Sequence, residues 1–363
     1  MKLSLSWIKD FVNIPEDMDL KQLAYDLTMS TVEVEDVEDL ARRFDNMVVG
    51  VIEKIEAHPN ADKLRVCKVD IGDGEIKDIV CGGINLEEGM RVAVSCPGAV
   101  VRWHGEGEPV VIKNSKLRGV ESYGMICASD EIGLGDLFPA EREAEILDLS
   151  AFDVPAGTPL ADALDMNDVL LEIDNKSMTN RPDLWGHYGI AREIAALYNL
   201  KLKEIEPFET DVQSDFHVEI LDPDRCTRYI GVEMSGVAVK PSPYKMQNRI
   251  WKAGMRPINA LVDITNYVML ATGNPTHAFD ADNITDHIVV RHAAEGEKLV
   301  LLNDKELSLC PDDLVITDSE GPVALAGVMG GAKDSILPKT QRVILEVANF
   351  EAAGIRRTAL RYD

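Results

Sequence analysis

The feature that most limits how this chain can fold is a series of short strand-like runs that begins at Met47. Each run is rich in β-branched residues, and clusters of Gly, Asn and Pro separate it from the next. The runs are VVGVIEKIEAH, KLRVCKVDIGDG, IKDIVCGG, RVAVSC and PVVIKNSK. Five short strands within about a hundred residues are typical of a small β-barrel. We therefore predict a barrel domain over residues 41–150.

Mixed strand and helix patterns lie on both sides of the predicted barrel. The N-terminal run KLSLSWI favours a short strand, and DLKQLAYDLTMS predicts a helix with Asp19 as its N-cap. After the barrel, residues 183–200 have helical periodicity, and Asp183 is the expected N-cap. Residues 1–40 and 151–200 are therefore predicted to form one N-terminal α+β domain into which the barrel is inserted.

The rest of the chain, residues 201–363, predicts a second mixed domain. Residues 201–216 are acidic and without clear periodicity, as in a linker, and two helical stretches follow between residues 241 and 272. Five β-rich runs come next: HIVVRHA, KLVLLND, DLVITDSEG, PVALAGVMGG and QRVILEVANF. The expected fold class is a multidomain α+β protein.

Composition limits the kinds of partner that the chain can bind. The 37 basic and 63 acidic residues give a formal charge of −26, which opposes non-specific adhesion to nucleic acid or to anionic membranes. No run is long and apolar enough for a signal peptide or a membrane span, so we expect a cytoplasmic protein. The six cysteines lack CxxC pairs, which favours buried thiols and no metal, although four of them between residues 67 and 127 leave zinc open.

Positive side chains gather in two parts of the predicted barrel, which makes them candidates for contacts to RNA phosphates. They are Lys63, Arg65, Lys113, Lys116 and Arg118. The alternative is an ordinary solvated surface, because residues 41–150 hold 13 basic and 20 acidic side chains. His58, in the segment HPNAD, is explained more simply as part of a turn.

A second candidate site lies in VDITNYVMLATGNPTHAFD, residues 262–280. The apolar spacing is that of a helix, yet short polar residues occupy its first turns, where they compete with helical hydrogen bonding. Gly273 and Pro275 then favour a tight turn, which returns His277 to the same neighbourhood. The arrangement is either a functional site or a tightly bonded corner.

The barrel segments resemble the OB-fold tRNA-binding domain that is appended to several aminoacyl-tRNA synthetases. The flanking segments LSWIKDFVNIP, TNRPDLWGHYGIAREIAAL, RYIGVEM, MRPINALVDITNYVMLATGNPTHAFD, ALAGVMGG and ILEVANF follow in the order found in β subunits of bacterial phenylalanyl-tRNA synthetase. This resemblance covers essentially the whole chain. It implies the N-terminal part of such a subunit: an OB fold in the first domain, then an editing domain of the B3/B4 type.

The resemblance also implies a site that hydrolyses tyrosine wrongly attached to tRNA(Phe). His277 and Asn266 are its expected catalytic residues, and Thr265, Gly327 and Glu346 its expected substrate-binding residues. No Ser-His-Asp or Cys-His arrangement is indicated, so His277 and a tRNA ribose hydroxyl are expected to orient a water molecule.

Each of these residues has a simpler alternative. His277 could be a structural histidine beside a turn, and Asn266 could cap a loop. The glycines of ALAGVMGG could serve a bulge. Glu346 could face water, although a carboxylate with apolar neighbours on its own face is costly to desolvate without a partner.

The resemblance further implies tRNA(Phe) and a catalytic α subunit as partners, in an α2β2 heterotetramer. Aminoacylation would belong to the α subunit. We expect no cofactor in this part of the subunit, with ATP and magnesium required by the whole enzyme. Two other readings stay open: a free-standing tRNA-binding or trans-editing factor, and a non-catalytic module for subunit assembly.

Overall fold

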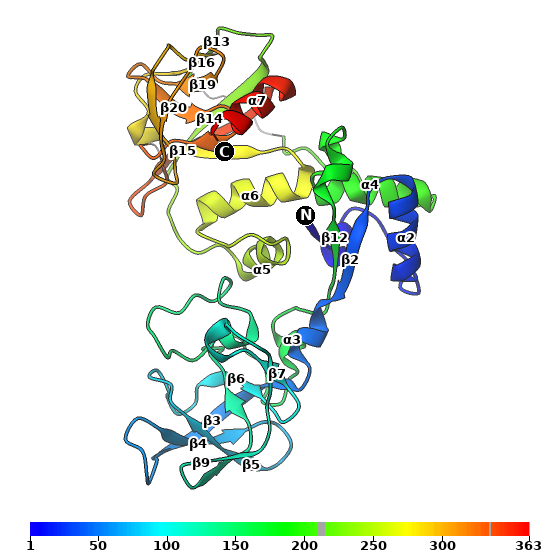
Figure 1. Cartoon of the computed structure of the whole chain (residues 1–363), viewed down its shortest axis with the longest axis vertical. Coiled ribbons are helices and arrows are strands. Elements are labelled where there is room, and N and C mark those ends of the chain that lie inside the picture. The colour runs from blue at the N-terminus through cyan, green and yellow to red at the C-terminus, as the bar shows by residue number, and fades with distance from the viewer. Residues whose placement is uncertain (210–214, 334, 363) are drawn as a thin grey trace.

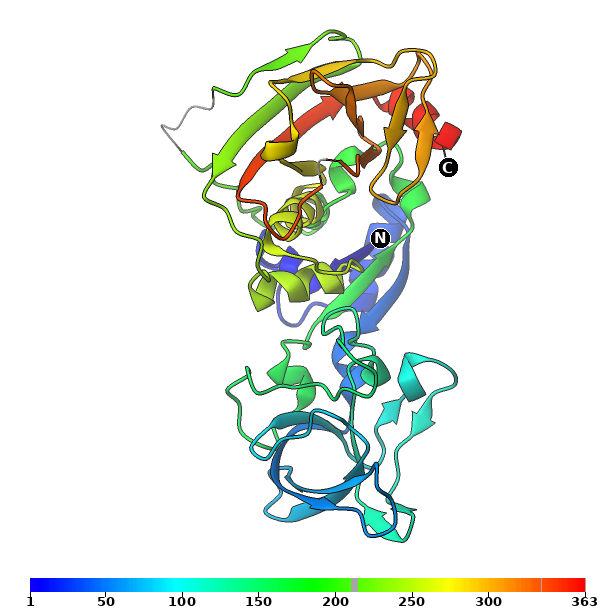
Figure 2. The same ribbon diagram turned by 90° about the vertical axis from the view of Figure 1, so that its left-hand side faces the viewer.

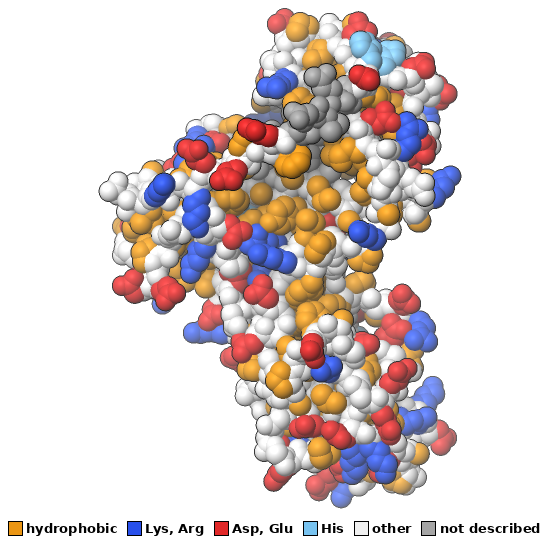
Figure 3. All heavy atoms as spheres, turned by 180° about the vertical axis from the view of Figure 1, so that it is seen from behind, with side chains coloured by type: hydrophobic (Ala, Val, Ile, Leu, Met, Phe, Trp, Pro, Cys, Tyr) orange, Lys and Arg blue, Asp and Glu red, His pale blue; other side chains and the backbone are white. Residues whose placement is uncertain are grey.

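The computed structural model describes residues 1–209, 215–333 and 335–362. The molecule is elongated, with a β-rich region at each end and helices between them (Figure 1). Charged side chains of both signs are scattered over the face seen in Figure 3, and apolar side chains gather across its middle. The mixed α+β class is confirmed.

A three-stranded sheet forms the centre of the N-terminal region. Its order is β1-β12-β2, with both pairings antiparallel, so strands from before and after the barrel share one sheet. The elements are β1 (Lys2–Ser4), β2 (Val34–Asp39), β12 (Val169–Ile173), α1 (Leu5–Ile8), α2 (Leu20–Ser30), α3 (Leu160–Ala163) and α4 (His187–Leu197). A core that includes Leu3, Leu23, Leu171 and Ile190 lies between the sheet and the helices.

Asp19 is the N-cap of α2, as predicted, and accepts hydrogen bonds from the backbone N–H groups of Lys21 and Gln22. Two local predictions were wrong. LSWI forms α1 instead of continuing the strand, because the Ser4 hydroxyl caps the N–H of Trp7. Asp183 does not cap α4, which begins after Gly186.

Asp183 instead binds two arginines, Arg181 at 2.8 Å and Arg192. These contacts hold its pKa at about 2, chiefly because Arg181 donates hydrogen bonds to the carboxylate. Asp183 therefore forms ion pairs with the two arginines and does not cap the first N–H groups of α4.

The barrel is a five-stranded, nearly closed sheet with the order β11-β6-β3-β4-β5, and Figure 2 looks along its axis. Its strands are β3 (Met47–Ala57), β4 (Arg65–Asp70), β5 (Ile76–Cys81), β6 (Arg91–Ser95) and β11 (Met125–Ile126). Four of the five predicted strands belong to this sheet, but PVVIKNSK does not form the fifth. It divides between two short ribbons made by β7 (Val100–Val101), β8 (Val110–Val111), β9 (Ser115–Leu117) and β10 (Val120–Ser122).

The C-terminal region contains two principal sheets. One has the order β13-β16-β19-β20-β21 and the other β14-β22-β15, with the ribbon β17-β18 beside them. The strands are β13 (Val218–Ile220), β14 (Cys226–Ser235), β15 (Thr276–Asp280), β16 (Ile288–His292), β17 (Lys298–Val300), β18 (Glu306–Ser308), β19 (Leu314–Thr317), β20 (Pro322–Leu325), β21 (Met329–Gly330) and β22 (Arg342–Phe350). Helix α7 (Ala352–Tyr362) packs next to β19. A shared core includes Tyr229, Phe279, Ile316 and Ile344.

Two helices connect the C-terminal sheets to the N-terminal region: α5 (Tyr244–Lys252) and α6 (Ala260–Thr272). Figure 1 shows α6 between β15 and α5. Their apolar residues Ile250 and Leu270 pack with Trp7 of α1 in a core of their own. Six 3-10 turns complete the described elements: Leu40–Phe44, Trp103–Gly105, Asp130–Ile132, Asn175–Met178, Pro182–Leu184 and Ala281–Asn283.

Candidate functional site

His277 and Glu346 lie side by side, although 68 residues separate them in the chain. The antiparallel register of β15 and β22 places the two residues directly opposite each other. Side chains of directly opposite residues project from the same face of a sheet. Two of the five residues expected in the editing site are therefore brought together.

Glu346 faces the core and not solvent, and only 8% of its surface is exposed. Tyr229 lies diagonally across β14 and donates its hydroxyl proton to Oε2 of Glu346 over 3.0 Å. Oε1 has no hydrogen-bond partner among the described residues. Burial raises the pKa of Glu346 to about 7, and the bond from Tyr229 opposes that shift.

The His277 ring packs between Phe279 and the backbone of β21. The two ring centroids are 4.6 Å apart in an edge-to-face arrangement. A Cβ atom on Gly330 would lie 2.7 Å from Cε1 of His277, so only glycine permits this approach. Neither ring nitrogen of His277 has a hydrogen-bond partner in the described parts of the chain. Burial lowers its pKa to about 4, which keeps the ring neutral at pH 7.

Polar residues in the first turns of α6 form hydrogen bonds within the fold. Asn259 caps the helix, and Asp263 accepts a bond from the N–H of Ile258 at 2.7 Å and another from the Ser242 hydroxyl. Asp263 and Thr265 are therefore bound within the fold.

Thr265 donates its hydroxyl proton to the carbonyl of Val262, and its own carbonyl accepts a bond of 3.1 Å from the Thr276 hydroxyl. This second bond places Thr265 beside the strand that carries His277. The side chain of Asn266 is half-buried and makes no hydrogen bond within the described residues, so its amide is available.

Gly327 contacts other residues than Gly330 does, and His277 is not among its nearest neighbours. Its φ of +66° suits glycine, and an added Cβ would contact Ile355 and Phe350 at 3.2 Å. Gly330, two residues before the end of GVMGGA, is the glycine that touches His277. The sequence shows the glycine run, but the site prediction named Gly327 and gave Gly330 no role. The run itself is the sequence feature that pointed to this part of the site.

The barrel cations lie in two segments, residues 63–65 and 113–118, that the structure brings together. Asn60 donates to the carbonyl of Arg118 at 2.9 Å, and Nε2 of His58 lies 3.1 Å from the carbonyl oxygen of Leu117. His58 thus joins the two segments, as a structural residue would. The five cations named from the sequence, Lys63, Arg65, Lys113, Lys116 and Arg118, are all exposed.

Lys116 also lines a hollow of about 470 Å³, together with Asn114 and Tyr123. Asp78 and Glu121 line it too, so its charge is mixed.

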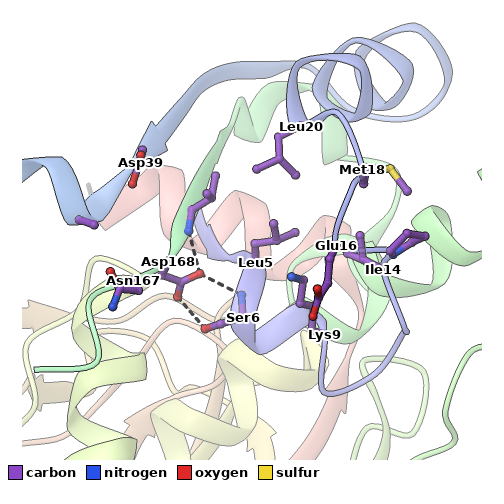
Figure 4. A pocket seen from close by; sticks show the side chains of 13 residues that line it. Leu5, Ser6, Lys9, Ile14, Glu16, Met18, Leu20, Asp39, Asn167 and Asp168 are labelled. Carbon is purple, nitrogen blue, oxygen red and sulfur yellow. Dashed lines mark hydrogen bonds between the residues drawn. The ribbon is translucent and has the colours of Figure 1, made fainter. Parts of the chain in front are cut away.

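A second hollow, of about 430 Å³, lies near the junction of the barrel and the N-terminal sheet (Figure 4). Asp168 in its wall accepts hydrogen bonds from the Ser4 hydroxyl at 2.6 Å and from the Ser6 hydroxyl at 2.7 Å, and pairs with Lys252 at 3.2 Å. Burial tends to raise the pKa of Asp168, but these partners outweigh burial and lower it. This carboxylate is bound within the fold and is not available to a ligand.

The described parts of the chain, residues 1–209, 215–333 and 335–362, contain neither a candidate metal site nor a membrane-spanning helix. Within these ranges, no three His, Cys, Asp or Glu side chains are grouped so that they could hold a metal ion. The helices in the same ranges are too short or too polar to cross a membrane.

Comparison with known proteins matches two segments to family models. Residues 47–158 match the putative tRNA binding domain, and residues 225–363 match the B3/4 domain. The phenylalanine–tRNA ligase beta subunit of Oceanobacillus iheyensis is 40% identical over 365 residues, which cover 99% of this chain. The corresponding subunit of Staphylococcus aureus is 41% identical over 369 residues and covers 100% of it.

The chain belongs to the phenylalanine–tRNA ligase beta subunit family.

The chain spans less than half the length of these family members, 44% and 45% respectively. Among solved structures, it is similar to an N-terminal fragment of the phenylalanyl-tRNA synthetase beta subunit from Pyrococcus horikoshii. That similarity has a TM-score of 0.31 and 19% identity, and it covers 54% of this chain and 62% of the fragment. Within the family frame, the five barrel cations lie in the tRNA-binding match, and Tyr229, His277, Gly330 and Glu346 lie in the B3/4 match.

Proposed function

We propose that this chain is the tRNA-binding and editing part of a phenylalanine–tRNA ligase β subunit, and that it hydrolyses Tyr-tRNA(Phe). The observation that carries the proposal is the pair His277 and Glu346 on one face of the B3/4 sheet. Both are titratable, Glu346 is buried and His277 is half-buried, and both have hydrogen-bonding atoms that the fold does not use. Such atoms are available to a ligand or to water.

The chemistry of selection explains why Glu346 is suited to the task. A pocket that binds phenylalanine cannot strongly reject a near-isostere with one added hydroxyl, whereas a pocket that hydrogen-bonds the hydroxyl discriminates by about 10⁴-fold or more. Glu346 offers Oε1 as an acceptor while Tyr229 holds Oε2. In this proposal Glu346 reads the para-hydroxyl of the misattached tyrosine.

His277 has the properties needed to orient water. Its neutral ring accepts a proton from a water molecule as the water oxygen attacks the ester carbonyl. The ester bond to the ribose then breaks, and the ribose oxygen takes up the proton, with help from the neighbouring ribose hydroxyl. The products are free tyrosine and tRNA. Asn266 and Thr265 of α6 would position the aminoacyl group, and Gly327 would shape the neighbouring turn.

The remaining functions belong to the whole enzyme. We propose that the α subunit carries out aminoacylation with ATP and magnesium in an α2β2 heterotetramer, and that the barrel, of the OB type, binds tRNA(Phe). Accordingly, this chain alone should not charge tRNA with phenylalanine. Charging by highly purified chain would refute that division of labour.

The test is single-turnover deacylation of Tyr-tRNA(Phe) by the complete ligase, compared with a Glu346→Gln variant. The variant should hydrolyse Tyr-tRNA(Phe) more slowly and bind free tyrosine more weakly in calorimetry, because its neutral amide is a weaker acceptor than a carboxylate. Parental deacylation by a folded Glu346→Gln enzyme would leave the chain as a non-catalytic assembly module.

A further inference from the structure

One stretch of this acidic chain contains no acidic residue. Residues 234–262 are 29 consecutive positions without Asp or Glu, in a chain that has 63 of them. At the average frequency of the chain, about five acidic residues would be expected there. The stretch also carries five cations: Lys240, Lys245, Arg249, Lys252 and Arg256.

Two of these cations are part of the fold. Arg249 pairs with Asp10 at 2.6 Å and donates to the Tyr267 hydroxyl at 2.7 Å. Lys252 pairs with Asp168 at 3.2 Å and donates to the carbonyl of Asp165 at 2.6 Å. Both side chains are buried and serve the junction between α5 and the N-terminal region.

The other three cations are not used by the fold. Lys240, Lys245 and Arg256 are exposed, and their side chains make no hydrogen bond or ion pair within the described residues. Some exposed cations elsewhere have acidic partners, as Arg342 has in Glu233 and Asp282. Within residues 234–262 no acidic residue is available to pair with these three cations.

The stretch is bonded to the start of α6. The carbonyl of Lys240 accepts a bond of 2.8 Å from the N–H of Ala260, the first residue of that helix. The Gln247 amide donates to the carbonyl of Ser242 at 2.6 Å, which fixes α5 to the loop before it. Figure 1 shows that loop passing beside one end of α6. The free cations are thus anchored to the helix that carries Thr265 and Asn266.

The nearest acidic residue after the stretch does not cancel this positive charge at the surface. Asp263 is 1% exposed, and the Ser242 hydroxyl and the N–H of Ile258 both donate to it. Charges interact over about 8 Å at physiological salt, so a local region without acids attracts anions even on a chain of charge −26. Flexible lysines suit phosphate groups as point charges.

We propose that Lys240 and Lys245 bind the phosphodiester backbone of the acceptor end of tRNA while its 3′ aminoacyl ester occupies the editing site. The proposal rests on the proposed editing function, because the position of this surface on α6 is what selects RNA over an acidic protein. Arg256 adds to the same positive region. It is left out of the test because it lies two residues from Ile258, whose N–H holds Asp263.

The test compares Lys240→Gln/Lys245→Gln with a matched control, Lys21→Gln/Lys176→Gln, in the complete ligase. The control removes the same charge from two exposed lysines outside the stretch. The measurements are tRNA(Phe) affinity between 50 and 200 mM salt and single-turnover deacylation of Tyr-tRNA(Phe) at limiting and saturating enzyme. Calorimetry with free tyrosine reports whether the pocket itself is intact.

Loss of two phosphate contacts should reduce the slope of log affinity against log salt by about 1.4 to 1.8, which over this salt range is on the order of a tenfold difference. Deacylation should fall at limiting enzyme, recover at saturating enzyme, and leave tyrosine binding unchanged. The control should keep the parental slope.

An unchanged slope with parental deacylation would overturn the proposal, and so would a loss explained by failed assembly with the α subunit, which would indicate an acidic protein partner. If His277→Ala leaves deacylation intact while the lysine variant weakens tRNA binding, the editing function fails and the RNA surface stands.

Discussion

His187 at the helical junction and His277 in the B3/4 sheet have the same pKa shift but opposite hydrogen bonding. Burial lowers the pKa of each to about 4. In His187, Nδ1 donates to the carbonyl of Leu270 at 2.7 Å and Nε2 accepts from the N–H of Ser4 at 3.1 Å. Its ring also stacks on Trp7, with centroids 4.0 Å apart. The ring of His277 makes no hydrogen bond within the described residues.

The difference separates a structural histidine from a candidate catalytic one. Burial of an imidazole is compensated at His187 by two hydrogen bonds and a stacked ring, which join β1, α4 and α6. His277 is only half-buried, and neither of its ring nitrogens bonds to another described residue, so both can bind water or a ligand. A titratable side chain with a shifted pKa and unused hydrogen-bonding atoms is a candidate for a functional site.

The largest expected effect is on chemistry at His277. His277→Ala should slow single-turnover deacylation of Tyr-tRNA(Phe) by about 10²-fold or more, the usual contribution of general acid–base catalysis. The free energy of unfolding should change little, and free tyrosine should bind with nearly parental affinity. If the folded His277→Ala enzyme deacylates at the parental rate, His277 is a structural residue like His187 and has no catalytic role.

His187→Ala should have the complementary result. It removes a stacked ring and leaves the N–H of Ser4 and the carbonyl of Leu270 without partners, at a cost of about 2 to 4 kcal/mol in the free energy of unfolding. Denaturant titration measures this loss, and His187→Gln serves if the alanine variant does not fold. Deacylation per folded molecule should stay near parental, and a specific loss of turnover would contradict the structural assignment.

The stability of the fold should depend on pH through both histidines. Their folded pKa of about 4 lies below the ordinary value of 6.5, so the unfolded chain binds more protons between these values. Stability is complete above pH 6.5 and falls as the pH drops toward 4, by about 2 kcal/mol per histidine between pH 6.5 and pH 5. The free energy of unfolding, measured by denaturant titration at several pH values, should fall less steeply below pH 6.5 in His187→Gln and in His277→Gln than in the parental protein. A variant with the parental slope would show that its histidine is not buried in solution.

Tyr229→Phe should have a smaller effect, on the order of 1 kcal/mol or about fivefold, because it removes one hydrogen bond from Glu346. That bond opposes the rise of the Glu346 pKa to about 7, so its loss should raise the pKa further. If the ionised carboxylate of Glu346 binds the substrate hydroxyl, the deacylation rate should rise with pH around pH 7. The midpoint of this rise should lie at a higher pH in Tyr229→Phe than in the parental enzyme. Glu346→Gln should abolish this limb, and an unshifted midpoint in Tyr229→Phe would show that the tyrosine does not set the carboxylate.

The smallest effect on chemistry is expected from the barrel. Replacing Lys113, Lys116 and Arg118 by Ala should weaken tRNA binding and flatten its salt dependence, because fewer counterions are released. Turnover of bound Tyr-tRNA(Phe) should not change. An unchanged salt slope would show that these cations are only a solvated surface.

Much of the local structure was predictable because it depends on neighbouring residues. The Asp19 cap, four barrel strands and helix α6 follow from short-range patterns, and the structure agrees. The failures are also local. Ser4 begins a helix within LSWI, and Asp183 binds arginines instead of capping α4, because in each case a polar side chain had two possible partners.

The candidate site was predictable only as a set of residues. Nothing between Thr265 and Glu346 indicates from spacing alone that His277 opposes Glu346, since the register of β15 on β22 decides it. Gly330 could not be distinguished from Gly327 for the same reason, because the contact with His277 depends on how β21 passes the sheet.

The sequence by itself determined the elements, the family and the residue types available for chemistry, because caps, periodicity and shared motifs are properties of adjacent residues. Only the tertiary structure decided which of these residues meet. In the folded structure both ring nitrogens of His187 form hydrogen bonds, whereas those of His277 form none within the described residues. Arg249 and Lys252 form ion pairs inside the fold, whereas Lys240 and Lys245 form none within the described residues. The physical reason is that burial and hydrogen bonding depend on contacts between distant segments, and the linear order of residues does not specify those contacts.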